Sequence, residues 1–243
     1  MVRFFVSPGE LGMEQPILTG ENRKHAKVLR LRPGEEVLLC DGQGKECLCR
    51  IEAVGEGAYT LTVLERRNFD REPSVRASVY MAFPKADKLE HVIQKATELG
   101  AYEIVVFPSG RCVSRPDEKS LNKKLERWQK IAASASEQSG RGWIPQVLAL
   151  DSFAQALQRA AQTDKALMFY EHEQAVTLKM ALTTGAFRTI SLLTGPEGGL
   201  EEGEVAQARQ AGLQVCTLGK RILRCETAPL CALSAVMYES GEF

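Results

Sequence analysis

Residues 188–200, RTISLLTGPEGGL, decide the fold of this chain of 243 residues. They begin as an apolar strand, pass through a turn that holds three glycines and Pro196, and enter a segment that opens with Glu201 and Glu202. A buried strand followed by a helix is the repeating unit of an α/β sheet. Glycine permits positive φ and close approach of a ligand to the backbone, and proline stiffens the turn. The stretch predicts a ligand-binding loop, with a tight turn that binds nothing as the alternative.

Residues 218–229, LGKRILRCETAP, form a second loop after an apolar strand. Three basic side chains, Arg224 among them, stand between apolar residues, while Thr227 is placed to cap the last helix and Pro229 suits its first turn. Ligands of open α/β sheets bind beyond the carboxyl ends of the strands. We therefore expect the two loops to share one site, although plain surface charges would also explain the basic residues.

From Pro73 onward, strands alternate with helices, which predicts a parallel sheet covered by helices. The expected strands are residues 76–83, 102–107, 165–170, 188–194 and 214–218. The expected helices are residues 85–99, 121–136, 152–161, 174–182, 201–211 and 227–238. In the first of these helices Leu89, Val92 and Ile93 share one face, and Gly100 ends it.

The first 72 residues have a different pattern, with short apolar stretches broken by turn residues. Strands are expected at residues 36–40, 46–54 and 59–64, with turns at 41–42 and 55–57. A compact β-barrel or sandwich follows from this pattern. The charged segment 66–73 ends in proline and is expected to be a linker, so the predicted domains are residues 1–72 and 73–243.

Composition limits the classes of function. Hydrophobic residues make up 44% and charged residues 26%, as in an ordinary folded domain. The formal net charge is zero, so any contact with nucleic acid must come from a local patch. No apolar run is long enough to cross a bilayer and the N-terminus lacks the pattern of a secretion signal, so we expect a cytoplasmic protein. Seven cysteines without a CxxC pair favour reduced thiols over a zinc site or disulfides.

Several common ligand motifs are missing from the sequence. The chain contains neither GxGxxG nor GxxxxGK[ST], which argues against a dinucleotide-dependent oxidoreductase, a P-loop nucleotidase and the common Rossmann-like methyltransferase. The three histidines are scattered and predict neither a metal cluster nor a catalytic triad. We expect His91 to be structural, whereas His172 follows a strand and is a weaker candidate for lining a site.

The two loops resemble the cofactor-binding motifs of the SPOUT methyltransferases, specifically the RsmE family of ribosomal RNA uridine N3-methyltransferases. Four further blocks are similar to that family, namely RFFV, HAKVLRLRPG, KADKLEHVIQKATELGA and ERWQKIAASASEQSGR. The resemblance covers most of the chain and is least diagnostic over residues 148–187. It implies an N-terminal PUA-like β-barrel that binds RNA, a C-terminal parallel-sheet SPOUT domain with a trefoil knot, and a homodimer.

The resemblance also implies that S-adenosylmethionine is the cofactor and that ribosomal RNA, within the small ribosomal subunit, is the substrate. Carried over residue by residue, the cofactor-binding positions are Thr194, Gly195, Pro196, Gly198, Gly199, Leu218, Gly219, Ile222, Leu223, Arg224, Thr227 and Ala228. The candidates to hold RNA phosphates are Arg3, Arg23, His25, Arg30, Arg32, Arg111, Arg115, Lys123 and Lys124. For the basic cluster at residues 23–32, a merely exposed basic face remains the alternative.

Uridine chemistry indicates what the catalytic residues must do. N3 carries a proton, so the nucleophile is the anion, and a cation near the uracil carbonyls would favour that anion. Arg224 is the candidate for this cation. Glu197 is the candidate proton acceptor, although an acid after a glycine turn is also explained as a helix-start carboxylate. No metal is expected to take part.

Two alternatives remain open. A related SPOUT enzyme would methylate a ribose 2′-oxygen or another base nitrogen. Only the N-terminal β module and the exact amino-acid sequence of the two loops favour uridine N3. From a different class, a catalytically silent RNA-binding assembly factor would keep the scaffold. Such a protein would have no need of Gly195, Gly198, Gly199 and Arg224, all of which are present.

Overall fold

The computed structural model describes residues 1–85, 87–113 and 116–243, and their contacts divide the chain into two compact units. The first unit comprises Met1–Glu72 and Ser136–Ile144, and the second comprises Pro73–Ala135 and Pro145–Phe243. The segment Ser136–Ile144 belongs to the first unit through its backbone: Gly44 N donates to Gly142 O at 3.2 Å, and Ile144 N donates to Gly42 O at 3.1 Å. No helix of the described chain is long and apolar enough to span a membrane.

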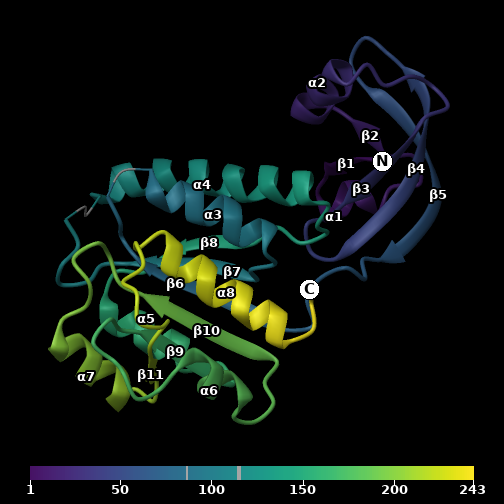
Figure 1. Cartoon of the computed structure of the whole chain (residues 1–243). Helices are drawn as coiled ribbons and strands as arrows, with labels where there is room; N and C mark the ends of the chain where they lie inside the picture. The colour runs from purple at the N-terminus through teal and green to yellow at the C-terminus, as the bar shows by residue number, and fades with distance from the viewer. Residues whose placement is uncertain (86, 114–115) are drawn as a thin grey trace. The chain divides into compact units, whose positions relative to one another are not determined.

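The first unit is built on a five-stranded sheet in the order β1-β3-β4-β5-β2 (Figure 1). Its strands are β1 (Val2–Phe5), β2 (Ile17–Leu18), β3 (Glu36–Cys40), β4 (Lys45–Val54) and β5 (Tyr59–Asn68). The pairings are antiparallel except that β1 runs parallel to β3. Alternate side chains of β3, β4 and β5 meet in a core with Phe4 and Leu18, so the unit has an apolar interior of its own.

The sequence prediction for this unit missed its helices and misplaced the linker. The helices α1 (Pro8–Leu11) and α2 (Gly20–Val28) were not expected; α2 buries only Ala26, so its apolar periodicity is weak. The linker expected at residues 66–73 was wrong over its first three residues, which belong to β5. Arg66 and Arg67 pair with Cys47 and Glu46 in the β4–β5 ladder, and backbone pairing does not depend on apolar side chains.

The second unit contains a six-stranded sheet in the order β11-β9-β10-β6-β7-β8, and every pairing in it is parallel. The strands are β6 (Arg76–Ala82), β7 (Glu103–Phe107), β8 (Gln146–Ala149), β9 (Lys165–Phe169), β10 (Thr189–Thr194) and β11 (Gln214–Cys216). The predicted parallel α/β architecture is therefore confirmed. The edge strand β8 was not expected, because its four residues carry little periodicity.

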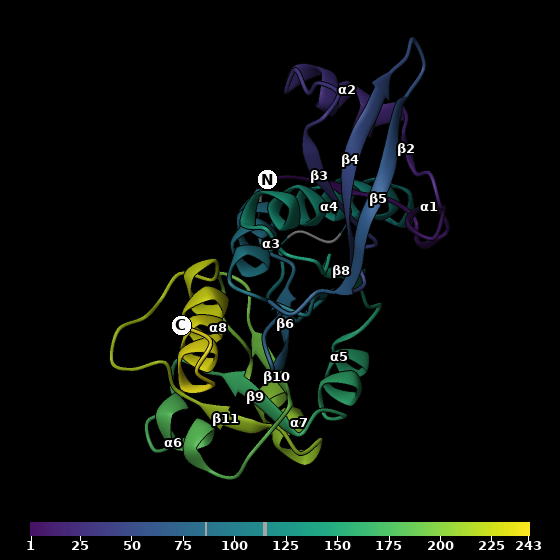
Figure 2. The same ribbon diagram turned by 90° about the vertical axis from the view of Figure 1, so that its right-hand side faces the viewer.

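Helices cover both faces of this sheet. They are α3 (Lys88–Glu98), α4 (Glu118–Ser139), α5 (Phe153–Ala160), α6 (Leu178–Thr183), α7 (Glu202–Gln210) and α8 (Thr227–Glu239). Figures 1 and 2 show α3 and α8 together on one face and α5 on the other, in agreement with the contacts of α8 with β6 and β10. From β6 the chain adds β7 and β8 on one side, whereas β9, β10 and β11 lie on the other side. The strand order therefore reverses between β6 and β10, a position where α/β proteins bind ligands.

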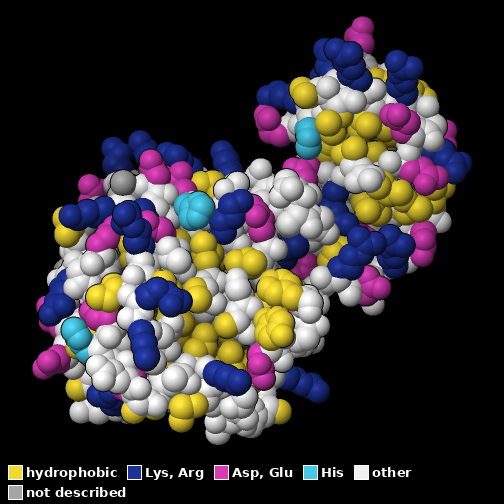
Figure 3. Space-filling model, in the orientation of Figure 1, with side chains coloured by type: hydrophobic (Ala, Val, Ile, Leu, Met, Phe, Trp, Pro, Cys, Tyr) yellow, Lys and Arg dark blue, Asp and Glu magenta, His cyan; other side chains and the backbone are white. Residues whose placement is uncertain are grey.

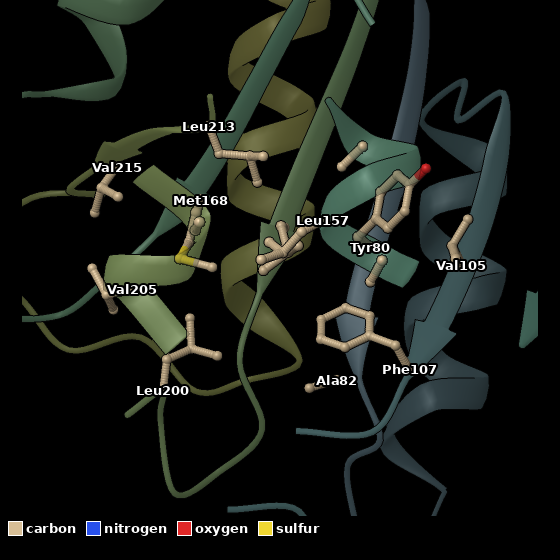
Figure 4. Packing of buried hydrophobic residues seen from close by; sticks show 14 residues of the cluster. Tyr80, Ala82, Val105, Phe107, Leu157, Met168, Leu200, Val205, Leu213 and Val215 are labelled. Atoms are coloured by element: carbon tan, nitrogen blue, oxygen red, sulfur yellow. The ribbon is translucent and has the colours of Figure 1, made fainter. Parts of the chain in front are cut away.

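One face of the sheet packs on α5 and α7 through a continuous apolar cluster. Figure 4 shows Leu157 of α5 among side chains of the strands, including Met168 and Tyr80. Leu200 and Val205 belong to the same cluster. Leu200 directly follows the glycine turn and is 1% exposed. Its burial anchors the end of that turn to the core, because pulling the turn outward would expose this side chain to water.

Two predicted helix starts need correction. Thr227 was expected to cap α8, but the N-cap is Glu226 and Thr227 is the first helical residue. The segment 174–182 was expected to be helical throughout, but α6 begins at Leu178, where the side chain of Thr177 accepts a hydrogen bond from Met180 N at 3.3 Å. Hydroxyl side chains cap helices from the residue before the first turn.

Candidate functional site

The loops that follow β9, β10 and β11 meet at the carboxyl edge of the parallel sheet. They enclose a cavity of about 520 Å³, which is the size of a small-molecule site. Phe169 ends β9 and residues 170–172 follow it. The glycine loop, Thr194–Leu200, starts at the last residue of β10, and the basic loop, Thr217–Glu226, follows β11. Lys88 at the start of α3 and Ala228 in α8 complete the lining.

The cavity brings together almost all of the cofactor-binding residues that the sequence proposed. Those that line it are Thr194, Gly195, Pro196, Gly198, Gly199, Leu218, Gly219, Ile222, Leu223, Arg224 and Ala228, and Glu197 lies there as well. Thr227 is described but is not among the lining residues. The two loops are far apart in sequence, so their convergence is the strongest structural sign of a site.

The glycines of the glycine loop occupy positions where a side chain would not fit well. Gly199 has φ +71, the left-handed region, and a Cβ built there would meet the carboxylate of Glu171. A Cβ on Gly195 would lie 3.0 Å from Leu200 Cγ, and one on Gly198 would lie 3.0 Å from Arg111 Cβ. The loop thus has glycine where its backbone lies close to Leu200, Arg111 and Glu171.

Hydrogen bonds fix the glycine loop at both ends. Thr194 Oγ1 donates to Tyr80 O at 3.2 Å, and Gly199 N donates to Pro196 O at 3.0 Å, which closes the turn. Arg111 Nη1 donates to Gly198 O at 3.0 Å. At the exit, the carboxylate of Glu204 accepts from Glu201 N at 2.9 Å and from Gly110 N at 2.8 Å, so α7 starts in a fixed position.

The basic loop is held mainly at its ends. Thr217 N donates to Val176 O at 2.8 Å, Gly219 N donates to Thr217 Oγ1 at 3.1 Å, and Arg224 O accepts from the first backbone N–H groups of α8. Between these ends the side chains face outward, and Ile222 is 86% exposed. An apolar side chain this exposed beside a cavity offers surface for a ligand to cover.

Lys88 links the two loops electrostatically. Its Nζ lies 3.0 Å from Glu197 Oε1 and 3.2 Å from Glu226 Oε2, and Lys85 N donates to the same Glu197 oxygen at 3.0 Å. Burial raises the pKa of Glu197, but backbone N–H groups and Lys88 outweigh this and hold it below its usual value. Backbone hydrogen bonding likewise lowers the pKa of Glu226, and the two carboxylates raise the pKa of Lys88. All three groups are charged at neutral pH.

Cys225 lies beside this cluster. Its Sγ is 3.7 Å from Lys88 Nζ and 3.3 Å from Glu226 Oε2. Burial, reinforced by the hydrogen bond to Glu226, raises the pKa of the Cys225 thiol to about 12. The thiol is therefore neutral at physiological pH and is not a nucleophile. Within the described residues, no group of three His, Cys, Asp or Glu side chains could hold a metal ion.

Sequence reasoning missed part of the lining. Lys88, Phe169, Tyr170 and Glu171 line the cavity, as does His172, which had been a weaker candidate. The signal for residues 169–172 was available, since they are the end of the strand predicted at residues 165–170 and the two residues that follow it. Lys88 gave no signal, because it stands among other charged residues at a helix start.

In the first unit, some of the proposed RNA-binding side chains are exposed, whereas others contact residues of the same unit. Lys and Arg side chains gather over α2 in Figure 3, and Arg30 and Arg32 are exposed. Arg23 is half-buried and donates to Glu56 O. His25 Nδ1 lies 3.2 Å from Glu137 Oε1, and the His25 ring packs edge-on against Phe4.

Arg3 does not fit the role that the sequence proposed for it. Its residue is 6% exposed, its Nη1 donates to Arg141 O at 2.7 Å, and its guanidinium lies 4.9 Å from the ring centre of Phe69 and 3.4 Å from Glu46 Oε2. A phosphate cannot reach this group without unpacking the unit. The prediction that Arg3 contacts RNA is therefore wrong, and Arg3 is an internal structural residue.

In the second unit, Arg111, Lys123 and Lys124 are exposed. The two lysines lie on α4, along which Figure 3 shows a row of Lys and Arg side chains. Arg111 lies at the rim of the glycine loop through its bond to Gly198. Arg115, also proposed from the sequence, is outside the described residues.

Comparison with known proteins gives consistent matches to both units. Residues 71–237 match the RNA methyltransferase domain family, and residues 18–64 match the RNA methyltransferase PUA domain family. A Bacillus subtilis protein named ribosomal RNA small subunit methyltransferase E is 38% identical over 99% of this chain and 97% of its own length. A Mycobacterium bovis protein of the same name is 34% identical over 90% of this chain and 85% of its own length.

A solved structure is similar over almost the full length. The Neisseria gonorrhoeae ribosomal RNA small subunit methyltransferase E, crystallised with S-adenosylmethionine, is 33% identical and has a TM-score of 0.85. The similarity covers 98% of this chain and 97% of the other. These matches confirm the resemblance found in the sequence, including its PUA-like first unit.

Proposed function

Because this chain belongs to the ribosomal RNA small subunit methyltransferase E family, we propose that it transfers a methyl group from S-adenosylmethionine to N3 of a uridine in 16S ribosomal RNA. The observation that carries the proposal is the convergence of the glycine loop and the basic loop on one cavity. These are the two segments in which the sequence resembles the family's cofactor-binding motifs, and they meet only in the folded chain.

The cavity fits the proposed cofactor in size and in chemistry. A nucleoside with an amino-acid tail needs backbone donors and acceptors, apolar surface for its base, and room of a few hundred Å³. Gly195, Gly198 and Gly199 expose backbone, while Ile222 and Leu223 offer the apolar surface. When bound, S-adenosylmethionine supplies a methyl group already activated on a sulfonium. The residues of the chain must then orient the acceptor and exclude water.

Arg224 is the proposed catalytic cation. It lies in the cavity lining and its backbone carbonyl is fixed by the first turn of α8, so the side chain projects from an anchored position. A guanidinium stays charged across the working pH range. Beside the uracil carbonyls it would stabilise the N3 anion, an effect that for a preorganised donor amounts to about 100-fold to 1,000-fold in rate.

Glu197 has a more constrained role than the sequence indicated. Its carboxylate accepts from Lys85 N and pairs with Lys88, and both contacts favour the ionised form. A carboxylate with a lowered pKa is a weak base, so we propose proton acceptance by Glu197 only through a water molecule. Release of the N3 proton to solvent, promoted by Arg224 alone, remains the simpler route.

RNA contacts, assembly and the knot belong to the same proposal. We propose that Arg23, His25, Arg30 and Arg32 of the first unit, with Arg111, Arg115, Lys123 and Lys124 of the second, hold RNA phosphates. The protein would act as a cytoplasmic homodimer on the small ribosomal subunit, with domains at residues 1–72 and 73–243. Passage of the final segment through a loop would form the trefoil knot, and the family membership supports each of these expectations.

The decisive experiment is transfer of labelled methyl from S-adenosylmethionine to small ribosomal subunits that lack the modification, followed by nuclease digestion and mass identification of the product. We expect N3-methyluridine from the wild type. Arg224→Ala should lower the rate about 100-fold or more with cofactor binding reduced far less. Ribose methylation would reassign the chain to the sister activity, and absence of both transfer and saturable cofactor binding would favour the silent assembly factor.

A further inference from the structure

We propose that Lys88 is a positioning residue that sets the separation of the glycine loop and the basic loop by bridging Glu197 of the first to Glu226 of the second. The proposal rests on the proposed function, since it assigns Lys88 to the site where the cofactor would bind. Lys88 is the first residue of α3, an element that neither loop belongs to, so the bridge ties both loops to a third part of the unit.

The first argument is geometric. One nitrogen contacts Glu197 Oε1 at 3.0 Å and Glu226 Oε2 at 3.2 Å, so these two carboxylate oxygens lie within about two hydrogen-bond lengths of each other. The side chains of Lys88, Glu197 and Glu226 are 30%, 25% and 21% exposed, respectively. Partly buried charges at this distance interact more strongly than exposed pairs, because solvent screens them less.

The second argument concerns what happens when the lysine is removed. Two carboxylates that share one ammonium attract it, but without the ammonium they repel each other. The Glu197 carboxylate is also anchored by Lys85 N at 3.0 Å and belongs to a braced loop. The repulsion would therefore act mainly on Glu226 and would displace the basic loop outward.

The third argument is that Lys88 is poorly placed for any local purpose. A positive charge in the first turn of a helix opposes the helix dipole, which favours acids there. The N-cap of α3, Asp87, makes no side-chain capping bond. Both partners of Lys88 come from loops of the cavity rather than from α3 itself, where Glu90 is the acid of the first turn.

The test combines a measurement on the free protein with one on ligand binding. Amide hydrogen exchange of the full-length protein without cofactor reports the order of residues 217–226 directly. Calorimetric binding of S-adenosylhomocysteine reports whether the cavity is formed, without turnover. The variants are Lys88→Met, Lys88→Arg, Glu226→Gln and the pair Lys88→Met with Glu226→Gln. Lys95→Met is the matched control, because Lys95 lies on the same helix and forms a local ion pair with Glu98 at 2.8 Å, outside the cavity lining.

Lys88→Met should raise exchange in the basic loop and weaken S-adenosylhomocysteine binding by about tenfold, the scale of a coupling between neighbouring charged groups. Adding Glu226→Gln should recover about half or more of that loss on a logarithmic scale, because it removes the repulsion. Lys88→Arg should retain most of the affinity, and Lys95→Met should change neither readout. In turnover assays, Lys88→Met should raise KM for the cofactor by a larger factor than it lowers kcat.

Two results would overturn the proposal. Weaker binding with unchanged exchange in the free protein, and no recovery on adding Glu226→Gln, would make Lys88 a direct ligand contact. Unchanged exchange and unchanged binding would make it an ordinary surface ion pair. If the wild type does not bind S-adenosylhomocysteine, the proposed function fails. Amide hydrogen exchange of the free Lys88→Met protein and of the double variant Lys88→Met with Glu226→Gln still decides whether the bridge orders the basic loop. If Lys88→Met does not fold, Glu226→Gln alone still tests it, since it should raise exchange in residues 217–226 and leave the glycine loop unchanged.

Discussion

The two loops of the cavity are built by opposite means. In the glycine loop, Leu200 is 1% exposed, three glycines pack against neighbouring atoms, and a hydrogen bond from Arg111 holds Gly198 O. In the basic loop, no atom of the described residues, chain neighbours aside, lies within 4 Å of where a Cβ on Gly219 would stand, and Ile222 is 86% exposed. One loop is braced by packing, whereas the other is tethered at its ends and by Lys88.

This difference indicates a division of work. A braced loop presents backbone groups in fixed positions, which suits recognition of a cofactor at low entropic cost. A tethered loop can close over a ligand, because few buried contacts oppose its movement. Substitutions in the glycine loop should therefore affect both stability and binding, and substitutions in the basic loop should affect binding while leaving stability nearly unchanged.

The largest effect is expected from Gly199→Ala. The residue has φ +71, and its new methyl group would also force the Glu171 carboxylate aside. We expect a loss of about 1–2 kcal/mol in unfolding free energy and a loss of cofactor affinity of about 100-fold, the typical cost of misplacing a binding group. Denaturant unfolding and calorimetry measure the two effects.

The matched control for that change is Gly212→Ala. Gly212 has φ +90 in open space after α7 and does not line the cavity. It should show a similar loss of stability with unchanged cofactor affinity. Equal affinity losses in the two variants would mean that backbone strain alone weakens binding, and the braced loop would then have no special role.

The second effect, Gly219→Ala, tests the tethered loop. Gly219 has φ +107, but no neighbouring atom lies within 4 Å of the added Cβ. A loop free to relax should limit the loss of unfolding free energy to less than about 1 kcal/mol, and cofactor affinity should fall by about tenfold, an order of magnitude less than for Gly199→Ala. If Gly219→Ala proves as damaging to stability as Gly199→Ala, the basic loop is as rigid as the glycine loop.

A smaller effect is expected from Ile222→Ser. The side chain is 86% exposed in the free protein, so its loss should leave the melting temperature unchanged. Covering it with a ligand would contribute about 1 kcal/mol, so the cofactor Kd should rise by about fivefold. Met180→Ser on α6 is the control, since Met180 is 54% exposed and lies outside the cavity lining. An unchanged Kd for Ile222→Ser would mean that the ligand does not touch this residue.

The same contrast explains what the sequence could predict. The parallel sheet and both loops were predictable, because buried strands appear in the sequence as apolar runs and glycine turns appear as glycines between them. Segments without that signal were missed, such as α2, which buries a single residue, and β8, an edge strand of four residues.

Contacts that depend on the fold were not predictable either. Arg3 is a basic residue near the N-terminus and was proposed as an RNA contact, yet β1 pairs with β3 and the Arg3 guanidinium lies toward Glu46 in the interior. Lys88 is separated by more than a hundred residues from the carboxylates it bridges. Such ion pairs need no particular spacing in the chain, so only the assembled sheet reveals them.

The smallest effect at neutral pH concerns Cys225, at the junction of the basic loop and α8. Its folded pKa of about 12 lies above the ordinary thiol value, so the thiol stays protonated until the solution becomes strongly alkaline. At pH 8 an alkylating reagent should label the exposed Cys231 and leave Cys225 unmodified, as mass spectrometry of peptides can measure. Labelling of Cys225 should then rise about tenfold per pH unit toward pH 11, because the thiolate is the reactive form. Rapid labelling of Cys225 in the wild type at pH 8 would instead mean that the basic loop is already open in the free protein, and the tether would then form only when the cofactor binds.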